Sequence, residues 1–522
     1  MVRALTTPTT ATPLSSLTHA QLVERVQSLQ HRLAWFERQL FGSKSERLRV
    51  LENERQLSLG EIVSTPAPAA AARERVVAAH TRRVAQRDAA AVGEAESVPF
   101  FDETRVPIET IPVPAPELQE VPSDQLEVIG EKVSYRLAQR PGSYVVLKYV
   151  RPVVKRRDTQ QISCAPAPQG VLEGSRADVS FIAGLLVDKF LYHLPLYRQH
   201  QRLNDSGIRI SRPWLTQLVS QGVGLLEPIY AAQLDSIRES RVKSMDETPI
   251  KAGRVGHGKM KTAYFWPIYG ERDEVCFPYF PSRAHQHVHT ALGLRQVPGS
   301  VLLSDGYAAY ASYAAKVGIT HAECWSHARR ELFEAQAMEP DRVHEALEQI
   351  AAIYAIEKEI RERKLVGEAK RLHRLTHSKP RVEMFFGWVD RQLQDQGLLP
   401  SNPFTKALGY VRHRRAQLQV FLTDPDVPID TNHLERALRV IPMGRKNWNF
   451  CWTELGAEHV GIMQSLLVTC RLHDIDPYDY LVDVLQRVAV HPASRVAELT
   501  PRLWKQHFAA SRLYSALHTL SV

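Results

Sequence analysis

The sequence predicts a multidomain protein of α+β and α/β class, built around a mixed sheet that a block of helices interrupts. Three observations lead to this prediction. The chain has 522 residues, too many for one ordinary domain. Residues 241–332 alternate strand-like and helix-like segments, which is typical of a mixed α/β sheet. Residues 333–430 have helical periodicity, so we expect an all-helical insertion there.

Composition narrows the class of protein. Hydrophobic residues make up 44% of the chain, enough to build folded cores. No run of about 18 apolar residues predicts a membrane span, and the N-terminus lacks the apolar core of a secretory signal. The net charge of +9 permits a polyanionic partner without identifying one. We therefore expect a cytoplasmic protein with no membrane partner.

The first 58 residues contain a candidate coiled coil. Apolar residues recur at alternating spacings of four and three, at Leu22, Val26, Leu29, Leu33, Phe36 and Leu40. This a/d pattern predicts a short coiled coil and self-association, although an amphipathic helix packed on its own domain would give the same pattern. Lys44 and Arg47 follow as candidate DNA contacts. Residues 59–125 are rich in Ala and Pro and are expected to form a linker.

A small basic β module is predicted for residues 126–170. Between residues 132 and 157 there are eight basic residues and no acidic one, on β-branched and aromatic segments that indicate strands. Such a surface suits the phosphate backbone of DNA, but a solvated basic edge that blocks strand pairing fits equally well. The candidate DNA contacts here are Lys148, Arg151, Arg156 and Arg157.

Two flanking regions are expected to be helical. Residues 171–240 are interpreted as a helical DNA-binding region, in which Ser211 caps a helix that has Pro213 in its first turn. Two helices separated by a short turn fit either a helix-turn-helix or an ordinary helical hairpin. Residues 471–522 are expected to form a C-terminal helical segment.

Residues 241–470 carry the candidate chemistry. Asp246 lies in or just after the first predicted strand, and Asp305 ends the fourth. If these strands are neighbours, both carboxylates point into one crevice at the carboxyl ends of the strands, where ligands gather in open α/β sheets. Two such carboxylates repel each other unless a cation lies between them, and hard oxygen ligands select Mg²⁺ or Mn²⁺. Glu247 is the alternative to Asp246, since neighbours on a strand face opposite sides.

A third carboxylate, Glu435, would complete a site for two metal ions. It lies on a predicted helix whose other face carries Leu434, Leu438 and Ile441. An ordinary surface pair between Glu435 and a neighbouring arginine is the alternative. The candidate phosphate-binding cations nearby are Arg436, Arg439, Arg445 and Lys446.

Other candidate DNA contacts lie between these carboxylates. His327 follows the fifth predicted strand and would line the site, or else be a structural histidine at a strand end. Arg329 and Arg330 begin the next helix and either bind phosphates or are simply solvated. Lys259 lies close after Asp246 in the sequence and is a further candidate phosphate contact.

Six motifs together resemble the insertion-sequence-66 family of bacterial transposases. They occur in the family's order over residues 20–50 and 130–490, and they are "RQLFGSKSER", "MDETPIK", "LLSDGYAAY", "CWSHARRELFEA", "NHLERALRVIPMGRKNW" and "DPYDYL". The resemblance implies an RNase H-like catalytic domain with an Asp-Asp-Glu metal triad, which falls on Asp246, Asp305 and Glu435. Relatives often carry paired cysteines before this domain, but here only Cys164 remains, which argues against zinc.

The resemblance also implies an activity and partners. A transposase of this family would bind the terminal inverted repeats of its element, nick them with two Mg²⁺ or Mn²⁺ ions, and transfer the freed 3′-hydroxyl to target DNA. It would act as a dimer or higher oligomer on the bacterial nucleoid, with accessory proteins encoded by the element. The alternatives are a DNA-binding regulatory protein descended from such an enzyme, or a structure-specific nuclease that cuts without joining.

Overall fold

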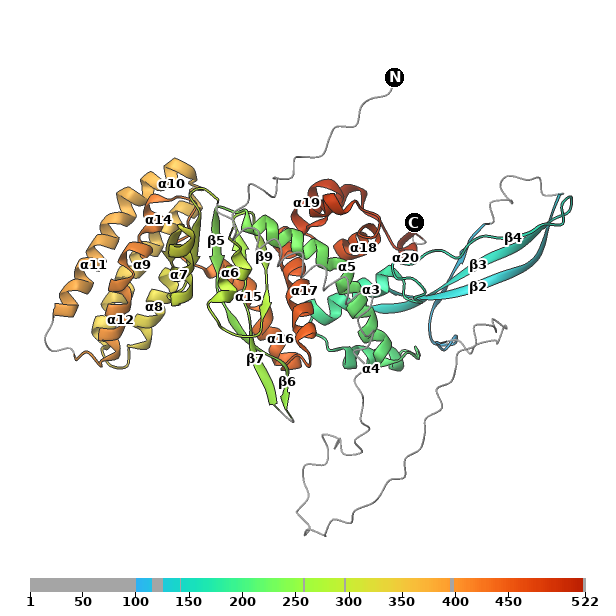
Figure 1. The fold of residues 1–522 in the computed structure, drawn as a ribbon, viewed down its shortest axis with the longest axis horizontal. Coiled ribbons are helices and arrows are strands. Elements are labelled where there is room, and N and C mark those ends of the chain that lie inside the picture. Colours follow the sequence, from blue (N-terminus) through green and yellow to red (C-terminus); the bar gives the residue numbers. More distant parts are fainter. Residues whose placement is uncertain are drawn as a thin grey trace, which may run out of the picture. The chain divides into compact units, whose positions relative to one another are not determined.

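A computed structural model describes most of the chain after residue 99. The described residues are 100–114, 125–140, 142–256, 259–294, 297–394 and 399–519. The predicted coiled coil at residues 22–40, with Lys44 and Arg47, therefore lies outside the described residues. The chain divides into two compact units, residues 1–102 and 103–522, and nearly all described residues belong to the second (Figure 1).

The core of the second unit is a five-stranded mixed sheet in the order β12-β11-β5-β8-β9. Its strands are β5 (Val242–Met245), β8 (Ile268–Gly270), β9 (Glu274–Cys276), β11 (Val301–Ser304) and β12 (Thr320–Glu323). β11 pairs in parallel with β5 and with β12, whereas β8 is antiparallel to β5 and to β9. Of these five strands, β5 comes first in the sequence and lies in the middle of the sheet, with antiparallel strands on one side and parallel strands on the other.

Hydrophobic cores cover both faces of this sheet, because successive residues of a strand point to opposite faces. Val301 and Leu303 pack with helix α8 (Trp325–Glu334) and the helices that follow it, whereas Leu302 packs on the opposite face. Three helices contribute to the core around Leu302: α5 (Arg212–Arg238), α6 (Gln286–Leu292) and α7 (Ala308–Val317). The sheet is therefore the middle layer of a three-layer arrangement.

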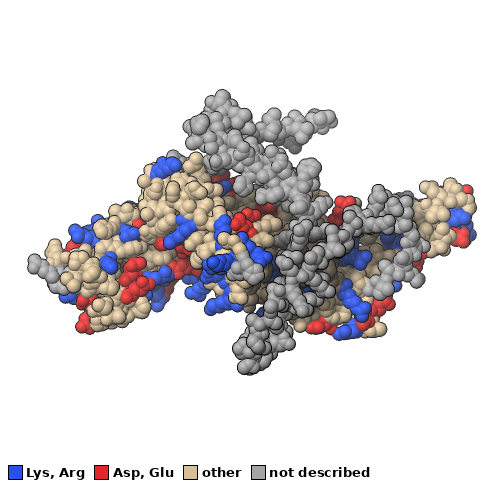
Figure 2. All heavy atoms as spheres, turned by 60° about the horizontal axis from the view of Figure 1, so that its bottom comes forward, with Lys and Arg blue, Asp and Glu red and all other residues tan. Residues whose placement is uncertain are grey.

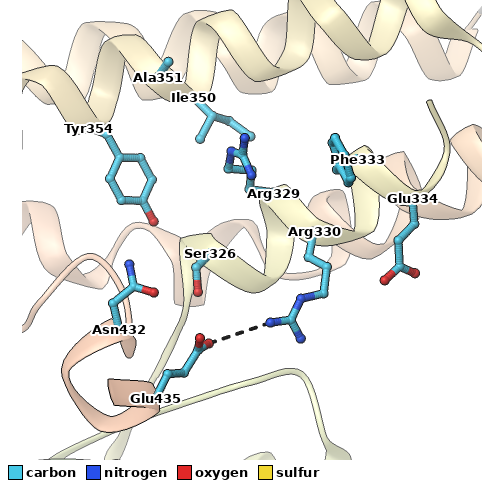
Figure 3. Close-up of a pocket in the computed structure, with 10 residues that line it drawn as sticks. All are labelled: Ser326, Arg329, Arg330, Phe333, Glu334, Ile350, Ala351, Tyr354, Asn432 and Glu435. Atoms are coloured by element: carbon cyan, nitrogen blue, oxygen red, sulfur yellow. Dashed lines mark ion pairs between the residues drawn. The ribbon is translucent and has the colours of Figure 1, made fainter. Parts of the chain in front are cut away.

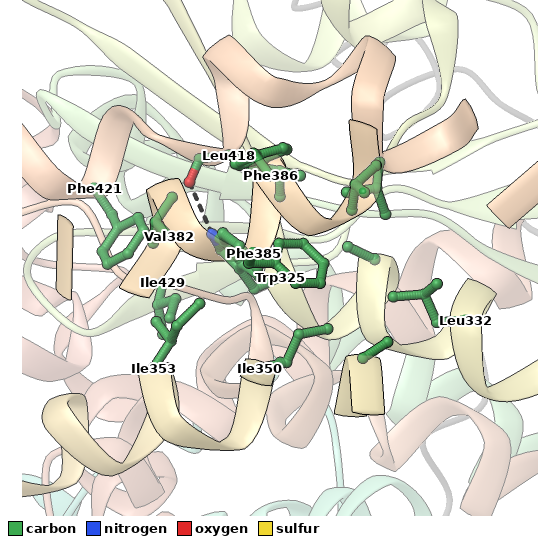
Figure 4. Packing of buried hydrophobic residues seen from close by; sticks show 14 of the residues in the cluster. Trp325, Leu332, Ile350, Ile353, Val382, Phe385, Phe386, Leu418, Phe421 and Ile429 are labelled. Atoms are coloured by element: carbon green, nitrogen blue, oxygen red, sulfur yellow. Dashed lines mark hydrogen bonds between the residues drawn. The ribbon is translucent and has the colours of Figure 1, made fainter. Parts of the chain in front are cut away.

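The residues after α8 (Trp325–Glu334) are helical, as their periodicity predicts. They form α9 (Pro340–Glu362), α10 (Gly367–His373), the π-helical turn η4 (Arg374–Ser378), α11 (Lys379–Gln394), α12 (Pro403–His413), α13 (Arg415–Leu418) and α14 (Val420–Thr423). Trp325 is fully buried among Phe385, Phe386 and Phe421, and its Nε1 donates a 2.7 Å hydrogen bond to the carbonyl of Leu418 (Figure 4). This tryptophan joins the helical insertion to the sheet.

Two segments whose sequence predicts a single strand, residues 241–251 and 262–270, each divide into two strands, so these predictions were wrong. Residues 241–251 form two strands, because the chain leaves the central sheet at Asp246 and enters a second sheet. That sheet contains β6 (Thr248–Gly256), β7 (Lys259–Phe265) and β10 (Tyr279–Phe280). Residues 262–270 also divide, at Trp266–Pro267, since a proline has no N–H to donate to a sheet ladder.

The basic module is strand-rich, and a helical region follows it. Its sheet contains β1 (Ile108–Pro112), β2 (Leu126–Arg140), β3 (Ser143–Arg156) and β4 (Ile162–Cys164). The helices are α3 (Val179–Leu186), the π-helical turn η3 (Val187–Leu191), α4 (Leu196–Asp205) and α5. The predicted cap of α5 is confirmed: Ser211 Oγ accepts a 3.4 Å hydrogen bond from the Trp214 N–H, and a proline lies in the first turn.

The C-terminal part of the chain returns to the central sheet. Its elements are α15 (Asn432–Leu438), α16 (Val440–Trp448), α17 (Glu454–Leu472), α18 (Pro477–Arg487), η5 (Ala493–Leu499), α19 (Pro501–His507), η6 (Ala509–Ser511) and α20 (Ala516–Thr519). Gln233 of α5 donates to Val275 of β9 at 2.8 Å and to Thr469 of α17 at 2.9 Å, which fixes α17 beside the sheet. Among the described residues, no helix has both the length and the apolar character needed to cross a membrane.

We predict that Gly461→Ala destabilises the protein by about 1–3 kcal/mol through overpacking. Gly461 lies where α17 passes over the chain after β9, and a Cβ there would come within 2.4 Å of the Phe277 carbonyl oxygen. Denaturant unfolding followed by circular dichroism measures the change. Gly409→Ala on α12 is the matched control: its Cβ would meet nothing within 4 Å, so alanine should leave stability unchanged or raise it by up to about 1 kcal/mol. Equal effects of the two substitutions would contradict the packing of α17.

Candidate active site

The two aspartates follow neighbouring strands. β5 and β11 pair in parallel with Ser244 opposite Leu303, and each aspartate comes directly after its strand. Continuing this register by two residues places Asp246 opposite Asp305 at the carboxyl ends of both strands. The condition on which the predicted crevice depends, that these strands are neighbours, therefore holds.

Strand alternation puts both aspartates on the face of the sheet that α8 covers. Asp246 shares this face with Ser244, two residues before it, and Asp305 shares it with Leu303. Ser244 Oγ lies 3.0 Å from His433 Nε2, so the first turn of α15 packs directly on this face. Glu435 follows His433 by two residues and is thereby brought towards the aspartates.

The chain reaches α15 through hydrogen bonds to the start of α8. The Trp325 N–H donates to the Ile429 carbonyl at 3.1 Å. The backbone N–H and hydroxyl of Thr431 each lie 3.2 Å from the sulfur of Cys324. Glu435 N–H then donates to the Thr431 carbonyl at 2.9 Å in the first turn of α15. These contacts return a distant part of the sequence to the ends of β5 and β11.

His327 is the side chain that links the three carboxylates. Its Nε2 lies 3.9 Å from Glu435 Oε1, and the electrostatic fields of Asp246 and Asp305 both act on its ring. Burial lowers the pKa of His327, but Cys324 and the two aspartates outweigh this and raise it to about 9. The neighbouring negative charges therefore favour the protonated form of His327. The expectation of a strand end is corrected, since the strand stops at Glu323 and His327 lies on α8.

The carboxylates crowd one another. The pKa of Asp246 is raised to about 7, chiefly by burial and then by the charges of Glu247 and Asp305, which act against the lowering by the Glu247 N–H and by His327. Glu435 Oε1 is buried without a hydrogen-bond donor, and its cationic neighbours His327 and Arg330 lie 3.9 and 4.0 Å away. A buried carboxylate oxygen with no donor, beside other carboxylates, fits the coordination of a divalent cation. The residues present therefore suit Mg²⁺ or Mn²⁺ in kind.

The side chains do not converge on one point, however. Within the described ranges, no three His, Cys, Asp or Glu side chains are grouped closely enough to hold a metal ion. Asp246 Oδ1 accepts the Glu247 N–H at 2.7 Å, and Asp305 Oδ1 accepts the Tyr307 N–H at 3.0 Å. Closure of the site around an ion would require these carboxylate side chains to come closer together.

Glu247 is engaged by two partners of its own. Its Oε1 accepts a 2.7 Å hydrogen bond from Arg283 Nε, and its Oε2 accepts a 2.5 Å hydrogen bond from Tyr310 of α7. α7 lies on the opposite face of the sheet from α8. The geometry thus favours Asp246 over Glu247 as a partner of Asp305.

Sequence reasoning missed two residues beside Asp305. Glu323 ends β12 opposite Ser304, and burial raises its pKa to about 7 in spite of Arg414, whose Nε lies 2.9 Å from Glu323 Oε2. Arg414 also donates to the Gly306 carbonyl at 3.1 Å. The position of Glu323 at a strand's carboxyl end was a usable signal, but no sequence pattern links it to Arg414.

The remaining predicted DNA contacts within the described residues fall in four places. Arg329 and Arg330 lie on α8 with His327, whereas Arg436, Arg439, Arg445 and Lys446 lie on or between α15 and α16, and Lys259 begins β7. The contacts in the basic module belong to another sheet: Lys148, Arg151 and Arg156 lie on β3, and Arg157 follows it. Two of them have partners, since Arg151 donates to the Ala165 carbonyl and Arg156 pairs with Asp158. Figure 2 shows Lys and Arg side chains gathered near the middle of one face of the molecule.

Comparison with known proteins identifies the family. A family model described as "Transposase IS66 family" matches residues 174–459, more than half of the chain, and one described as "IS66 C-terminal element" matches residues 465–502. A third, described as "Transposase C of IS166 homeodomain", matches residues 28–91. The chain belongs to the IS66 family of transposases. This membership implies a DNA transposase, with DNA as its partner.

Curated relatives match over nearly the whole chain. Two proteins of Sinorhizobium fredii (strain NBRC 101917 / NGR234) carry the names "Uncharacterized protein y4hP" and "Uncharacterized protein y4jD". The first is 29% identical over 94% of this chain and 91% of its own length. The second is 27% identical over 94% of this chain and 98% of its own length. These matches run over nearly the full length of this chain and of both relatives.

We predict that Arg414→Ala lowers the free energy of unfolding by about 3–5 kcal/mol, because it leaves Glu323 buried beside Asp305 without its cation. The double variant Arg414→Ala/Glu323→Gln should recover part of this loss, since it also removes the buried charge. Urea unfolding of both variants measures the difference. Arg412→Ala is the control: its side chain is 60% exposed and 3.5 Å from Asp390, so the loss should stay below about 1 kcal/mol. A double variant no more stable than Arg414→Ala would refute the charge argument.

Proposed function

We propose that this transposase nicks the terminal inverted repeats of its element and joins the freed 3′-hydroxyl to target DNA, at a site formed by Asp246, Asp305 and Glu435. The observation that carries the proposal is that Asp246 and Asp305 follow neighbouring parallel strands, while His327, whose ring feels the charges of both, lies 3.9 Å from Glu435. Both reactions are in-line phosphoryl transfers: water attacks the phosphorus first, and the 3′-hydroxyl that it releases attacks a phosphorus of the target in the second step.

The strand order supports an RNase H-like catalytic domain. The middle strand β5 comes first in the sequence, β8 and β9 extend the sheet antiparallel on one side, and β11 and β12 extend it in parallel on the other. We propose that this domain covers residues 241–470, with the helical insertion at about 333–430. In this arrangement the first and fourth strands, which carry the aspartates, are neighbours by topology.

We propose that Asp246, Asp305 and Glu435 hold two Mg²⁺ or Mn²⁺ ions. Two such ions supply activation of the attacking oxygen and stabilisation of the leaving oxygen. The chain's own residues position the ligands: the ends of β5 and β11 hold the two aspartates, and α15 carries Glu435 on the same face of the sheet. Arg330, 4.0 Å from Glu435, and Arg436, which follows Glu435 in the chain, would hold a phosphate.

One observation favours the alternative of a DNA-binding regulator. The described side chains do not form a group of three metal ligands as they stand. Glu435 lies 3.9 Å from His327 and 4.0 Å from Arg330, both of which could pair with it instead of a metal ion. A regulator would bind element ends in a salt-sensitive way and never cut them. A structure-specific nuclease would cut but leave no joined product, so product analysis separates the three functions.

Further partners belong to the same proposal. Self-association through residues 22–40 would bring two copies to the two ends of the element. The basic module at residues 126–170 and the helices at residues 171–240 would bind the repeats outside the catalytic domain. Proteins encoded elsewhere in the element would assist, as in other members of the family to which the motifs belong.

We predict that Asp246→Asn reduces both cutting and joining of element-end DNA by at least about a hundredfold, because it removes a carboxylate that would bind the metal directly. End binding should remain within a few-fold of wild type. Gel analysis of labelled duplex ends with Mg²⁺, Mn²⁺ or chelator measures both products. Asp235→Asn is the matched control, since Asp235 is exposed on α5 and pairs with Arg238. Joining at the wild-type rate by Asp246→Asn would refute the triad.

We predict that Lys446→Ala weakens DNA binding about equally for all sequences and lowers the slope of log affinity against log salt by about 1. Lys446 is exposed on α16 close after Glu435, so it is placed to contact the phosphate backbone. Binding titrations at several salt concentrations measure the slope. Lys379→Ala on α11 is the control, because Lys379 is exposed but lies on the helical insertion beside Glu383. A change in slope for Lys379→Ala alone would place the DNA on the other surface.

A further inference from the structure

A pocket opens beside Glu435, between α8, α9 and the first turn of α15 (Figure 3). It has a volume of about 750 Å³, within the range of about 300–1,000 Å³ that is usual for small-molecule sites. Glu435 forms one wall of the pocket, and Phe333 and Ile350 line it further along α8 and α9. The pocket is therefore continuous with the carboxylate site yet extends away from the sheet.

One side of the pocket is apolar and accessible. Phe333 is 50% exposed although it is a large hydrophobic side chain, and Ile350 and Tyr354 lie on α9 across from α8. A half-exposed aromatic ring in a pocket that also carries polar groups is typical of a ligand site. The flat face of a nucleobase would cover Phe333, and base stacking on aromatic side chains is tolerant of sequence.

The other side of the pocket offers positive charge and hydrogen bonds. Arg329 has no hydrogen-bond or ion-pair partner among the described residues, and Arg330 lies 4.0 Å from Glu435, a long and weak pair. Ser326 and Asn432 add hydrogen-bonding groups near Glu435 and Tyr354. Two guanidinium groups beside an aromatic ring provide for the phosphate and the base of one nucleotide.

We propose that this pocket binds an unpaired nucleotide of the DNA strand, the one that adjoins the phosphate to be cut. The proposal rests on the proposed function, because Glu435 marks where that phosphate would lie. A duplex is too wide to enter such a pocket, so the base must leave its stack, at a cost of a few kcal/mol. Stacking on Phe333 and the contacts of Arg329 with the adjoining phosphate would offset that cost.

The test is a thermodynamic cycle between Phe333 and the base. In the Asp246→Asn background, which would leave the DNA uncut, Phe333→Ala should weaken binding of a duplex element end about fivefold or more. The same change should have less than about a twofold effect when the nucleotide on one side of the cut is abasic. Abasic nucleotides are placed in turn on each side of the cut, and a third is placed three nucleotides away. Fluorescence anisotropy at fixed salt gives the affinities.

Two controls separate the pocket from general DNA binding. Met384→Ala removes an apolar side chain that is also 50% exposed, on α11 outside the pocket, and should change no affinity. Arg329→Gln should weaken binding of the normal end, and a neutral methylphosphonate at the adjoining phosphate should abolish that effect. Free deoxynucleoside monophosphate in excess should not restore binding of the abasic end.

The outcomes for the pocket and for the proposed function are distinct. If Phe333→Ala weakens normal and abasic ends equally at both positions, the pocket proposal is wrong, even if the wild-type protein cuts the same end with Mg²⁺. Coupling to the base without any cutting would support the pocket and refute the catalytic function. If the protein binds the end no better than a scrambled duplex, both proposals are overturned.

Discussion

The joint between Trp325 and Ile429 is the interaction on which the candidate active site depends. It is a backbone hydrogen bond at the start of α8, reinforced by the contacts of Thr431 with Cys324. Helices α9 to α14 lie between Trp325 and Ile429 in the sequence, so this hydrogen bond brings together the two ends of the helical insertion. Trp325 itself is fully buried, and a buried tryptophan of this kind contributes several kcal/mol to folding. The site is therefore as stable as the core of the insertion.

This dependence explains why the insertion is more than an addition to the sheet. It supplies Arg414, whose guanidinium stacks 3.7 Å above the Tyr410 ring and reaches both Glu323 and the Gly306 carbonyl. A Cβ on Gly306 would come within 2.5 Å of the Tyr410 hydroxyl, so the turn after Asp305 must approach α12 closely. A buried acid cluster needs cations supplied from outside the sheet, because the sheet itself offers none on that face. The insertion and α8 provide them.

The sequence predicted the parts of this site that follow from strand geometry. Asp246 and Asp305 could be paired because each follows a strand and parallel strands end at the same edge. The cap at Ser211 and the helical insertion could be predicted because they depend on local spacing. The division of residues 241–251 into two strands could not, since both halves have strand-like side chains and only the tertiary structure assigns them to different sheets. The position of His327 on a helix was missed for a related reason: the residues around Trp325 suit the end of a strand and the start of a buried helix equally.

The ribbon formed by β6 and β7 gives the site a mechanical property. It begins two residues after Asp246, and Ala252 is bridged to Cys451 after α16. Arg445 of α16 also donates to the Pro249 carbonyl at 2.6 Å. Asp246 lies just before the ribbon, and Glu435 lies on the helix just before α16. The contacts between the ribbon and α16 therefore join the chain segments that carry the two carboxylates. A displacement of the ribbon is therefore passed to Asp246 along β6 and to Glu435 along α16 and α15.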